Sequence, residues 1–223
     1  ESPDGYYPDL LRPAEKGEIE FVNGGWCSVW FEVEAEERGK NKIEISLYNE
    51  ENDLVETREL TVKVINAKLP EQELICTNWF HCDCLATWYK VPVFSEEHWQ
   101  IIESFVKTAV DHGVNMLLTP LFTPPLDTEV GGERPTVQLV DVTVTGENKY
   151  SFGFEKLERW FKMALGCGVK QFELSHLFTQ WGAEHAPKIA DINGNKLFGW
   201  ETEASGEDYK AFLTQFACRL DEF

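Results

Sequence analysis

The sequence is short of basic side chains and has no long apolar run. With 20 Lys and Arg against 39 Asp and Glu, its formal charge is -19. Nucleic acids and anionic membrane surfaces attract proteins through basic patches, so this charge argues against both. No apolar stretch approaches the roughly 18 residues that a membrane span needs. We therefore expect neither nucleic acid nor a membrane as a partner.

Signatures of several catalytic and cofactor sites are also missing. There is no Gly-x-Gly-x-x-Gly after a strand, as dinucleotide-binding folds require, and no Gly-x-Ser-x-Gly, as in many serine hydrolases. His81, Asp83 and His176 could suggest a metal-dependent hydrolase, but no His-x-His pair occurs, and we disfavour that class. We expect no metal and no cofactor.

Six cysteines lack the two tight pairs of a zinc site. Cys76, Cys82 and Cys84 lie on one predicted strand, where residues of the same parity point to one face. The other three are scattered through apolar segments. We interpret all six as buried free thiols, which predicts a reducing, cytoplasmic compartment.

The first seventy residues alternate apolar and polar side chains over residues 18–21, 27–34, 42–48 and 59–65. This pattern is typical of half-buried antiparallel strands, and clusters of Gly, Asn and charged residues separate them. We predict that residues 1–70 form the C-terminal part of an antiparallel β-sandwich domain. The boundary falls at Leu69-Pro-Glu-Gln-Glu73, because proline resists a central strand and the charges favour solvent.

Residues 71–223 alternate strands with helices instead. A strand is predicted over residues 74–80, followed by a helix that Ser95 caps and Gly113 ends. Further helices are predicted from about residue 154 and over residues 207–220. The expected inward stripes are Trp99, Ile102, Phe105, Val106, Ala109 and Val110; Leu157, Trp160, Phe161, Ala164 and Leu165; and Tyr209, Phe212, Leu213, Phe216 and Ala217.

This alternation predicts parallel strands joined by right-handed crossovers. Polar runs follow two of the predicted strands, at residues 119–127 and 175–183, where an α/β barrel keeps its active site. A complete (β/α)8 barrel takes about 250 residues, whereas this part holds three βα units. We therefore predict the first three units of a (β/α)8 TIM-type barrel, incomplete in this chain, and expect an N-terminal fragment of a longer protein.

Six runs of sequence, spread over most of the chain, are similar to one known family. They are Trp79-Phe-His-Cys-Asp83, Val93-Phe-Ser-Glu-Glu-His-Trp99, Leu118-Thr-Pro-Leu-Phe-Thr-Pro-Pro-Leu-Asp-Thr128, Gly131-Gly-Glu-Arg-Pro-Thr-Val-Gln-Leu-Val-Asp141, Ser175-His-Leu-Phe-Thr-Gln-Trp-Gly182 and Phe198-Gly-Trp-Glu-Thr202. These runs resemble bacterial proteins related to glycoside hydrolase family 123, also called domain of unknown function 4091. The resemblance implies a β-sandwich followed by a (β/α)8 barrel, and exo-acting β-N-acetylgalactosaminidase activity on a carbohydrate substrate.

The same resemblance implies substrate-assisted, retaining hydrolysis. An adjacent Asp and Glu at a strand end would orient the substrate's 2-acetamido group and protonate the leaving oxygen, unlike the usual two-carboxylate scheme. The only Asp-Glu dipeptide, Asp221-Glu222, lies at a predicted helix end and is expected to be a charged helix terminus. We expect the catalytic pair beyond Phe223 and an inactive fragment.

Six residues are candidates for sugar binding. They are His81, Asp83, Arg134, His176, Gln180 and Trp181. His176, Gln180 and Trp181 combine hydrogen-bonding groups with an indole face, which suits a sugar ring. His81 and Asp83 could instead fix a loop at a strand end, and Arg134 could pair with Glu133 or Asp127.

The alternative function is a non-catalytic carbohydrate-binding or scaffold protein. A part-barrel also exposes the edges of its sheet, and we expect that these edges allow self-association.

Overall fold

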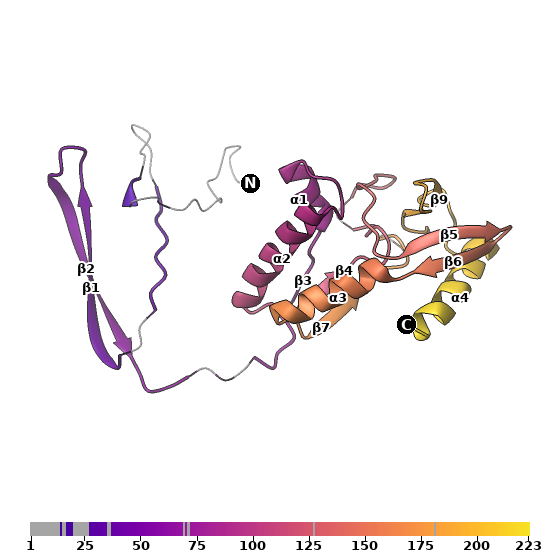
Figure 1. Ribbon diagram of the computed structural model, residues 1–223. Helices are drawn as coiled ribbons and strands as arrows, with labels where there is room; N and C mark the ends of the chain where they lie inside the picture. The colour runs from indigo at the N-terminus through magenta and orange to yellow at the C-terminus, as the bar shows by residue number, and fades with distance from the viewer. Residues whose placement is uncertain are drawn as a thin grey trace. The chain divides into compact units, whose positions relative to one another are not determined.

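The structure is a computed structural model that describes residues 14, 17–19, 27–34, 37–68, 70, 72–126, 128–180 and 182–223. The chain divides into two compact units, residues 1–70 and residues 71–223. Each unit is described by itself below (Figure 1).

The first unit contains an antiparallel hairpin of β1 (Gly39–Tyr48) and β2 (Leu54–Val64). The Asn49 side chain closes its turn by accepting the backbone N–H groups of Glu51 and Asp53. Ile43 lies opposite Leu60. Because every second side chain of a strand points to the same face, apolar side chains of both strands lie on one face of the hairpin. The predicted strands at residues 42–48 and 59–65 are thereby confirmed as an antiparallel pair.

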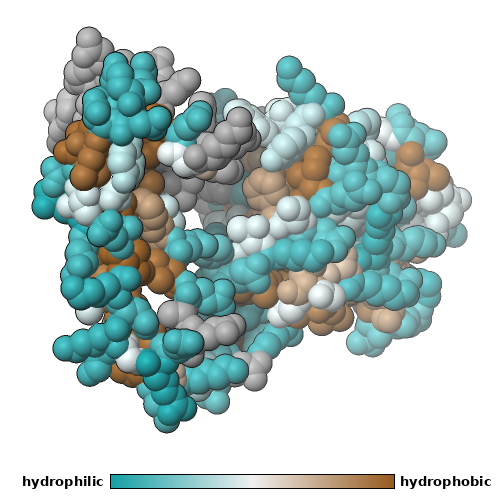
Figure 2. Space-filling model, turned by 60° about the vertical axis from the view of Figure 1, so that its left-hand side comes forward, coloured by the Kyte–Doolittle hydropathy of each residue, from teal (hydrophilic) through white to brown (hydrophobic). Residues whose placement is uncertain are grey.

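The predicted strand at residues 27–34 is wrong, because the structure assigns these residues no strand and pairs them with no other described segment. Alternation alone does not make a strand when no neighbour satisfies its backbone groups. The prediction for residues 18–21 falls partly outside the described residues. Figure 2 shows hydrophobic side chains at the surface of the hairpin. Leu47, Leu54 and Leu60 are exposed. The β-sandwich stays a prediction.

The second unit is built on a parallel sheet with the order β3-β4-β7. Its strands are β3 (Thr77–Asn78), β4 (Met116–Thr119) and β7 (Gln171–Leu174). Each is followed by a long helix: α2 (Glu96–Asp111), α3 (Glu155–Cys167) and α4 (Glu207–Asp221). The predicted alternation and parallel pairing are confirmed. The TIM-type barrel stays a prediction.

Local signals set the ends of these helices. The Ser95 hydroxyl accepts the His98 backbone N–H at 3.2 Å, as expected of an N-cap. Gly113 and Gly168 follow α2 and α3 with φ angles of +92° and +103°, a region that only glycine adopts readily. A Cβ on Gly168 would also lie 3.1 Å from a methyl group of Val110.

The core of this unit is formed by the inward faces of the three helices and by the strands. Its largest buried side chains on the helices are Trp99, Ile102, Val106, Leu157, Trp160, Tyr209, Phe212 and Phe216. Three predicted core positions are wrong: Phe105 is 42% exposed, Leu165 is 56% exposed and Ala217 is also exposed. All three lie at the margin of an apolar stripe, where helical spacing alone does not decide which side faces solvent.

The structure has three features that the sequence reading missed. Helix α1 (Cys82–Tyr89) follows β3, so Cys82 and Cys84 lie on a helix and not on the predicted strand with Cys76. Two hairpins were also missed: β5 (Asp141–Gly146) with β6 (Lys149–Gly153), and β8 (Ile189–Ala190) with β9 (Lys196–Phe198). Figure 1 shows β5 and β6 beside α4.

All six cysteines are unpaired thiols, but only Cys82 is fully buried, and Cys27, Cys84 and Cys218 are exposed. The prediction of six buried thiols is therefore wrong in part. Within the described residues, no helix is both long and apolar enough to cross a membrane.

Candidate functional site

The carboxyl ends of the three parallel strands meet at one edge of the sheet. Trp79 follows β3, Pro120 follows β4 and Ser175 follows β7. The backbone N–H of Ser175 donates to the carbonyl oxygen of Thr119 at 2.9 Å. The pairing of β4 with β7 therefore continues to the first residue after β7. The loops that leave this edge carry most of the candidate site residues.

Four residues form what we call the strand-end cluster: Thr77, Trp79, Glu173 and His176. The Thr77 hydroxyl donates to one carboxylate oxygen of Glu173 at 3.1 Å, and the Trp79 indole N–H donates to the other at 3.3 Å. The rings of Trp79 and His176 meet edge to face, with centroids 5.8 Å apart. Side chains from the first and third strands therefore contact each other across β4.

Asp83 and Arg134 form a buried ion pair. Arg134 Nε donates to a carboxylate oxygen of Asp83 at 3.0 Å, and the two side chains are 11% and 6% exposed respectively. The guanidinium also donates to the Leu126 carbonyl oxygen and to the Cys84 sulfur. The pair thus joins α1 to the loop after β4, and each side chain has its charged partner within the protein.

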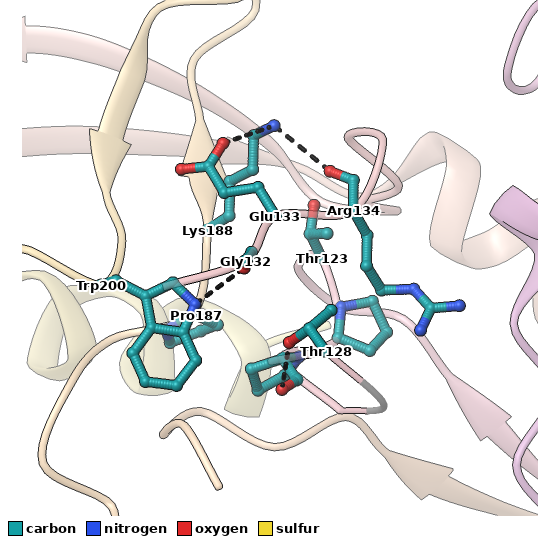
Figure 3. Close-up of a pocket in the computed structure, with 10 residues that line it drawn as sticks. Thr123, Thr128, Gly132, Glu133, Arg134, Pro187, Lys188 and Trp200 are labelled. Carbon is teal, nitrogen blue, oxygen red and sulfur yellow. Dashed lines mark hydrogen bonds and ion pairs between the residues drawn. The ribbon is translucent and has the colours of Figure 1, made fainter. Parts of the chain in front are cut away.

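A second ionic cluster lies next to this loop. Glu133 pairs with Lys188 at 3.2 Å, and Lys188 donates to the Arg134 carbonyl oxygen (Figure 3). Glu133 also pairs with Lys196. The hydrogen bond from Lys196 lowers the pKa of Glu133, and the same contact raises the pKa of Lys196. These contacts join the loop after β4 to the β8–β9 hairpin.

The cavity between these loops is small. Thr123, Pro187 and Trp200 line it, and the Trp200 indole N–H donates to the Gly132 carbonyl oxygen at 2.9 Å (Figure 3). Its volume of about 10 Å³ is enough for about one water molecule. The cavity cannot hold a sugar ring.

The predicted site residues are not gathered in one place. His176 is exposed in the strand-end cluster, and Asp83 and Arg134 form the buried pair. Gln180 donates to the Thr128 carbonyl oxygen at 2.7 Å, which ties the loop after β7 to the loop after β4. Trp181 lies outside the described residues.

Two expectations about these residues are wrong. His81 and Asp83, expected at the end of the first strand, belong to α1: His81 is its N-cap and Asp83 is in its first turn. Arg134 pairs with Asp83 and not with Glu133, and Asp127, the other partner considered, lies outside the described residues. The reason is the same in both cases, because the chain turns into α1 directly after the short β3 strand.

The sequence reading missed Trp79 and Glu173 as site residues. A signal was present, since Glu173 is an acidic residue between the apolar Phe172 and Leu174 on a predicted strand. Glu173 and His176 also have Glu-x-x-His spacing, but the described residues contain no group of three or more His, Cys, Asp or Glu that could hold a metal ion.

Comparison with known proteins gives a family. The model of the glycoside hydrolase 123 catalytic domain matches residues 79–223. A solved structure, of a family 123 glycoside hydrolase from Clostridium perfringens studied for glycolipid glycan hydrolysis, is similar with a TM-score of 0.64 and 16% identity. The similarity covers 83% of this chain and 34% of that chain, so this chain spans about a third of its relative's length. No curated protein matches the sequence. On the family match over residues 79–223, the chain belongs to the glycoside hydrolase 123 family.

Proposed function

We propose that the chain is the N-terminal part of a glycosidase that acts on β-linked N-acetylhexosamine glycosides, with N-acetylgalactosamine as the preferred sugar. The observation that carries the proposal is the family match over residues 79–223, which begins at the first strand end and includes all three loops of the candidate site. The preference for an acetamido sugar rests on the family resemblance of the sequence.

The proposed reaction is substrate-assisted and retaining. The carbonyl oxygen of the 2-acetamido group attacks the anomeric carbon while a glutamic acid protonates the departing glycosidic oxygen, and a neighbouring aspartate orients the acetamido group. Water then opens the resulting oxazolinium ion, and the glutamate takes the proton from that water. Two inversions at the anomeric carbon retain the configuration. An intramolecular nucleophile gains from proximity to the reacting carbon.

The Asp-Glu pair of this reaction is proposed to lie beyond Phe223. The only such dipeptide in this sequence, Asp221-Glu222, is a charged helix terminus, as expected. Helix α4 ends at Asp221, and Glu222 pairs with Arg219 one turn earlier in the helix. Both acidic residues are exposed and far along the chain from the strand ends. This chain would therefore contribute sugar-binding surface to the complete enzyme, not its acid and base.

Hydrolysis of aryl 2-acetamido-2-deoxy-β-galactoside and of the corresponding β-glucoside tests the proposal. Both substrates should be given to this chain and to a longer protein that continues past Phe223. We expect turnover by the longer protein alone, with the galactoside faster. Activity of the 223-residue chain by itself would place the catalytic groups among the residues described here. Activity in neither would refute the proposed substrate class.

Fluorination of the acetamido methyl group tests the mechanism separately. Each fluorine withdraws electron density from the carbonyl oxygen and makes it a weaker nucleophile. The rate of the longer protein should therefore fall steadily from acetamido to trifluoroacetamido. A rate that is independent of fluorine would indicate an enzymic nucleophile.

The alternative is a carbohydrate-binding or scaffold protein without catalysis. That function predicts sugar binding by the longer protein with no release of the aryl group. The outer edges of β3 and β7 are unpaired within the described sheet, and we propose that either the continuation of the chain or a second copy covers them.

A further inference from the structure

We infer that the strand-end cluster is a sugar-binding subsite in which Trp79 stacks against the apolar face of a pyranose, His176 hydrogen-bonds to its hydroxyl edge, and Glu173 is the positioning residue that holds the indole. This inference rests on the proposed function and assigns part of its substrate site to Trp79 and Glu173.

The cluster lies on the face of the sheet that the helices leave open. The ring of Phe172 packs against Phe161 of α3, with centroids 4.6 Å apart, so Phe172 points to the helical side. Successive residues of a strand point to opposite faces, so Glu173 points away from the helices. Thr77 and Trp79 share a parity in and just after β3, and both hydrogen-bond to Glu173. The inner face of a closed barrel would be this face.

The indole of Trp79 is both accessible and fixed. Trp79 is 45% exposed, whereas Trp99 and Trp160 are core residues. Its N–H, the only donor of the side chain, is held by the Glu173 carboxylate at 3.3 Å. An exposed tryptophan normally loses rotamer freedom when it binds a ligand, which weakens binding. The hydrogen bond to Glu173 already restricts the rotamers of Trp79 in the free protein. The free ring surface is apolar and prearranged.

The neighbouring groups suit a carbohydrate. A pyranose presents C–H groups on one face and hydroxyl groups around its rim, so it needs an aromatic surface with a polar group beside it. His176 supplies that group, because it is exposed and its ring meets the indole edge to face. An imidazole can both donate and accept, as a sugar hydroxyl can.

Glu173 acts on the sugar through Trp79. Its two carboxylate oxygens accept one hydrogen bond each, from Thr77 and from Trp79. A glutamine can keep both contacts, because its oxygen can accept from the indole while its amide donates to the Thr77 hydroxyl. An alanine can keep neither. Glu173→Gln should therefore bind sugar almost as well as the natural chain, and Glu173→Ala should not.

The test uses the eight tryptophans of the chain, each of which gives one indole N–H signal in a nitrogen–proton NMR spectrum. The Trp79 signal is identified by its loss in Trp79→Phe. N-acetylgalactosamine is then titrated up to about 100 mM, which detects even millimolar affinity. The inference predicts that the Trp79 signal shifts and that the signal of Trp88, which is 77% exposed on α1, does not.

Variants measure the size of the effect by the same titration. Loss of about 60 Å² of buried apolar ring surface corresponds to about a tenfold weaker affinity for Trp79→Ala. Glu173→Ala should weaken binding several-fold and move the Trp79 signal in the free protein, while Glu173→Gln should restore affinity to within about twofold. The matched control, Trp88→Ala, should bind normally.

The outcomes separate this inference from the proposed function. A shift of the Trp88 or Trp200 signal in place of that of Trp79, or no shift at all, would overturn the subsite, even if the longer protein hydrolyses the aryl acetamido sugars. Equal affinities of Glu173→Ala and Glu173→Gln would overturn the positioning role. A shift at Trp79 without hydrolysis by the longer protein would support the subsite and refute the glycosidase.

Discussion

Truncation of Asp83 to alanine is expected to lower the free energy of unfolding of residues 71–223 by about 3 kcal/mol. The carboxylate is 6% exposed and accepts from Arg134 at 3.0 Å. Loss of one partner of a pair this buried leaves the other charge uncompensated, at a cost of about 3–5 kcal/mol. We expect a cost at the lower end of this range, because the Arg134 guanidinium keeps its hydrogen bonds to the Leu126 carbonyl oxygen and the Cys84 sulfur.

A double-mutant cycle isolates the pair itself. Arg134→Met should cost more than Asp83→Ala, because it removes three hydrogen bonds at once. The double variant should cost about 2 kcal/mol less than the sum of the two single variants, since it leaves no buried charge behind. Urea unfolding followed by tryptophan fluorescence measures all four proteins, because the buried Trp99 and Trp160 report on this unit.

Glu158→Gln is the matched control for the cycle. It breaks an exposed pair with Lys162 on α3, where the side chains are 54% and 72% exposed. Such helical pairs contribute at most about 0.5 kcal/mol. Additivity of Asp83→Ala and Arg134→Met to within about 0.5 kcal/mol would refute the reasoning, because it would mean that the two charges do not interact.

Three further predictions concern stability and are measured by the same unfolding assay. Ser95→Ala removes the N-cap of α2 and should cost about 1 kcal/mol, whereas Ser95→Asp should keep most of it; equal losses would argue against capping. Ile102→Ala should cost about 2–5 kcal/mol because the side chain is fully buried, while Phe105→Ala on the exposed margin should cost clearly less. The pKa of Glu133 is lowered by its hydrogen bond from Lys196, so the contribution of this pair is present above pH 4.5 and is lost as the pH falls below it. Lys196→Met should make the free energy of unfolding depend less on pH below about pH 4.5. The same pH dependence as in the natural chain would contradict this prediction.

Much of the helical framework could be predicted from local signals. Ser95 has a side chain that competes for backbone N–H groups, and Gly113 and Gly168 adopt φ angles that few other residues tolerate. The apolar spacing of α4 placed Tyr209, Phe212 and Phe216 in the core. These features depend on residues close in sequence, so the sequence alone indicates them.

Features that depend on distant contacts could not be predicted in this way. The first residues of helix α1, Cys82, Asp83 and Cys84, alternate as a short strand would, and only tertiary packing decides between the two structures. The β5–β6 hairpin did carry a signal in the alternating Val142, Val144, Tyr150 and Phe152 around a turn at Asn148, with φ +49°.

The candidate site shows the same division. His176 could be recognised as a strand-end residue from its own neighbourhood. Arg134 hydrogen-bonds to Asp83, which is 51 positions away in the sequence, and Trp79 hydrogen-bonds to Glu173, which is 94 positions away. No spacing rule predicts such pairs, so the strand-end cluster emerges only from the fold.

The most direct measurement compares aryl 2-acetamido-2-deoxy-β-galactoside with aryl β-galactoside as substrates of a longer protein that contains this chain. The two compounds differ only in the acetamido group that the proposed reaction uses as its nucleophile. The account predicts that the acetamido compound is hydrolysed and that the compound without it is not, with the β-anomer as the first product. Comparable rates on both compounds, or an α-anomer as the first product, would contradict it.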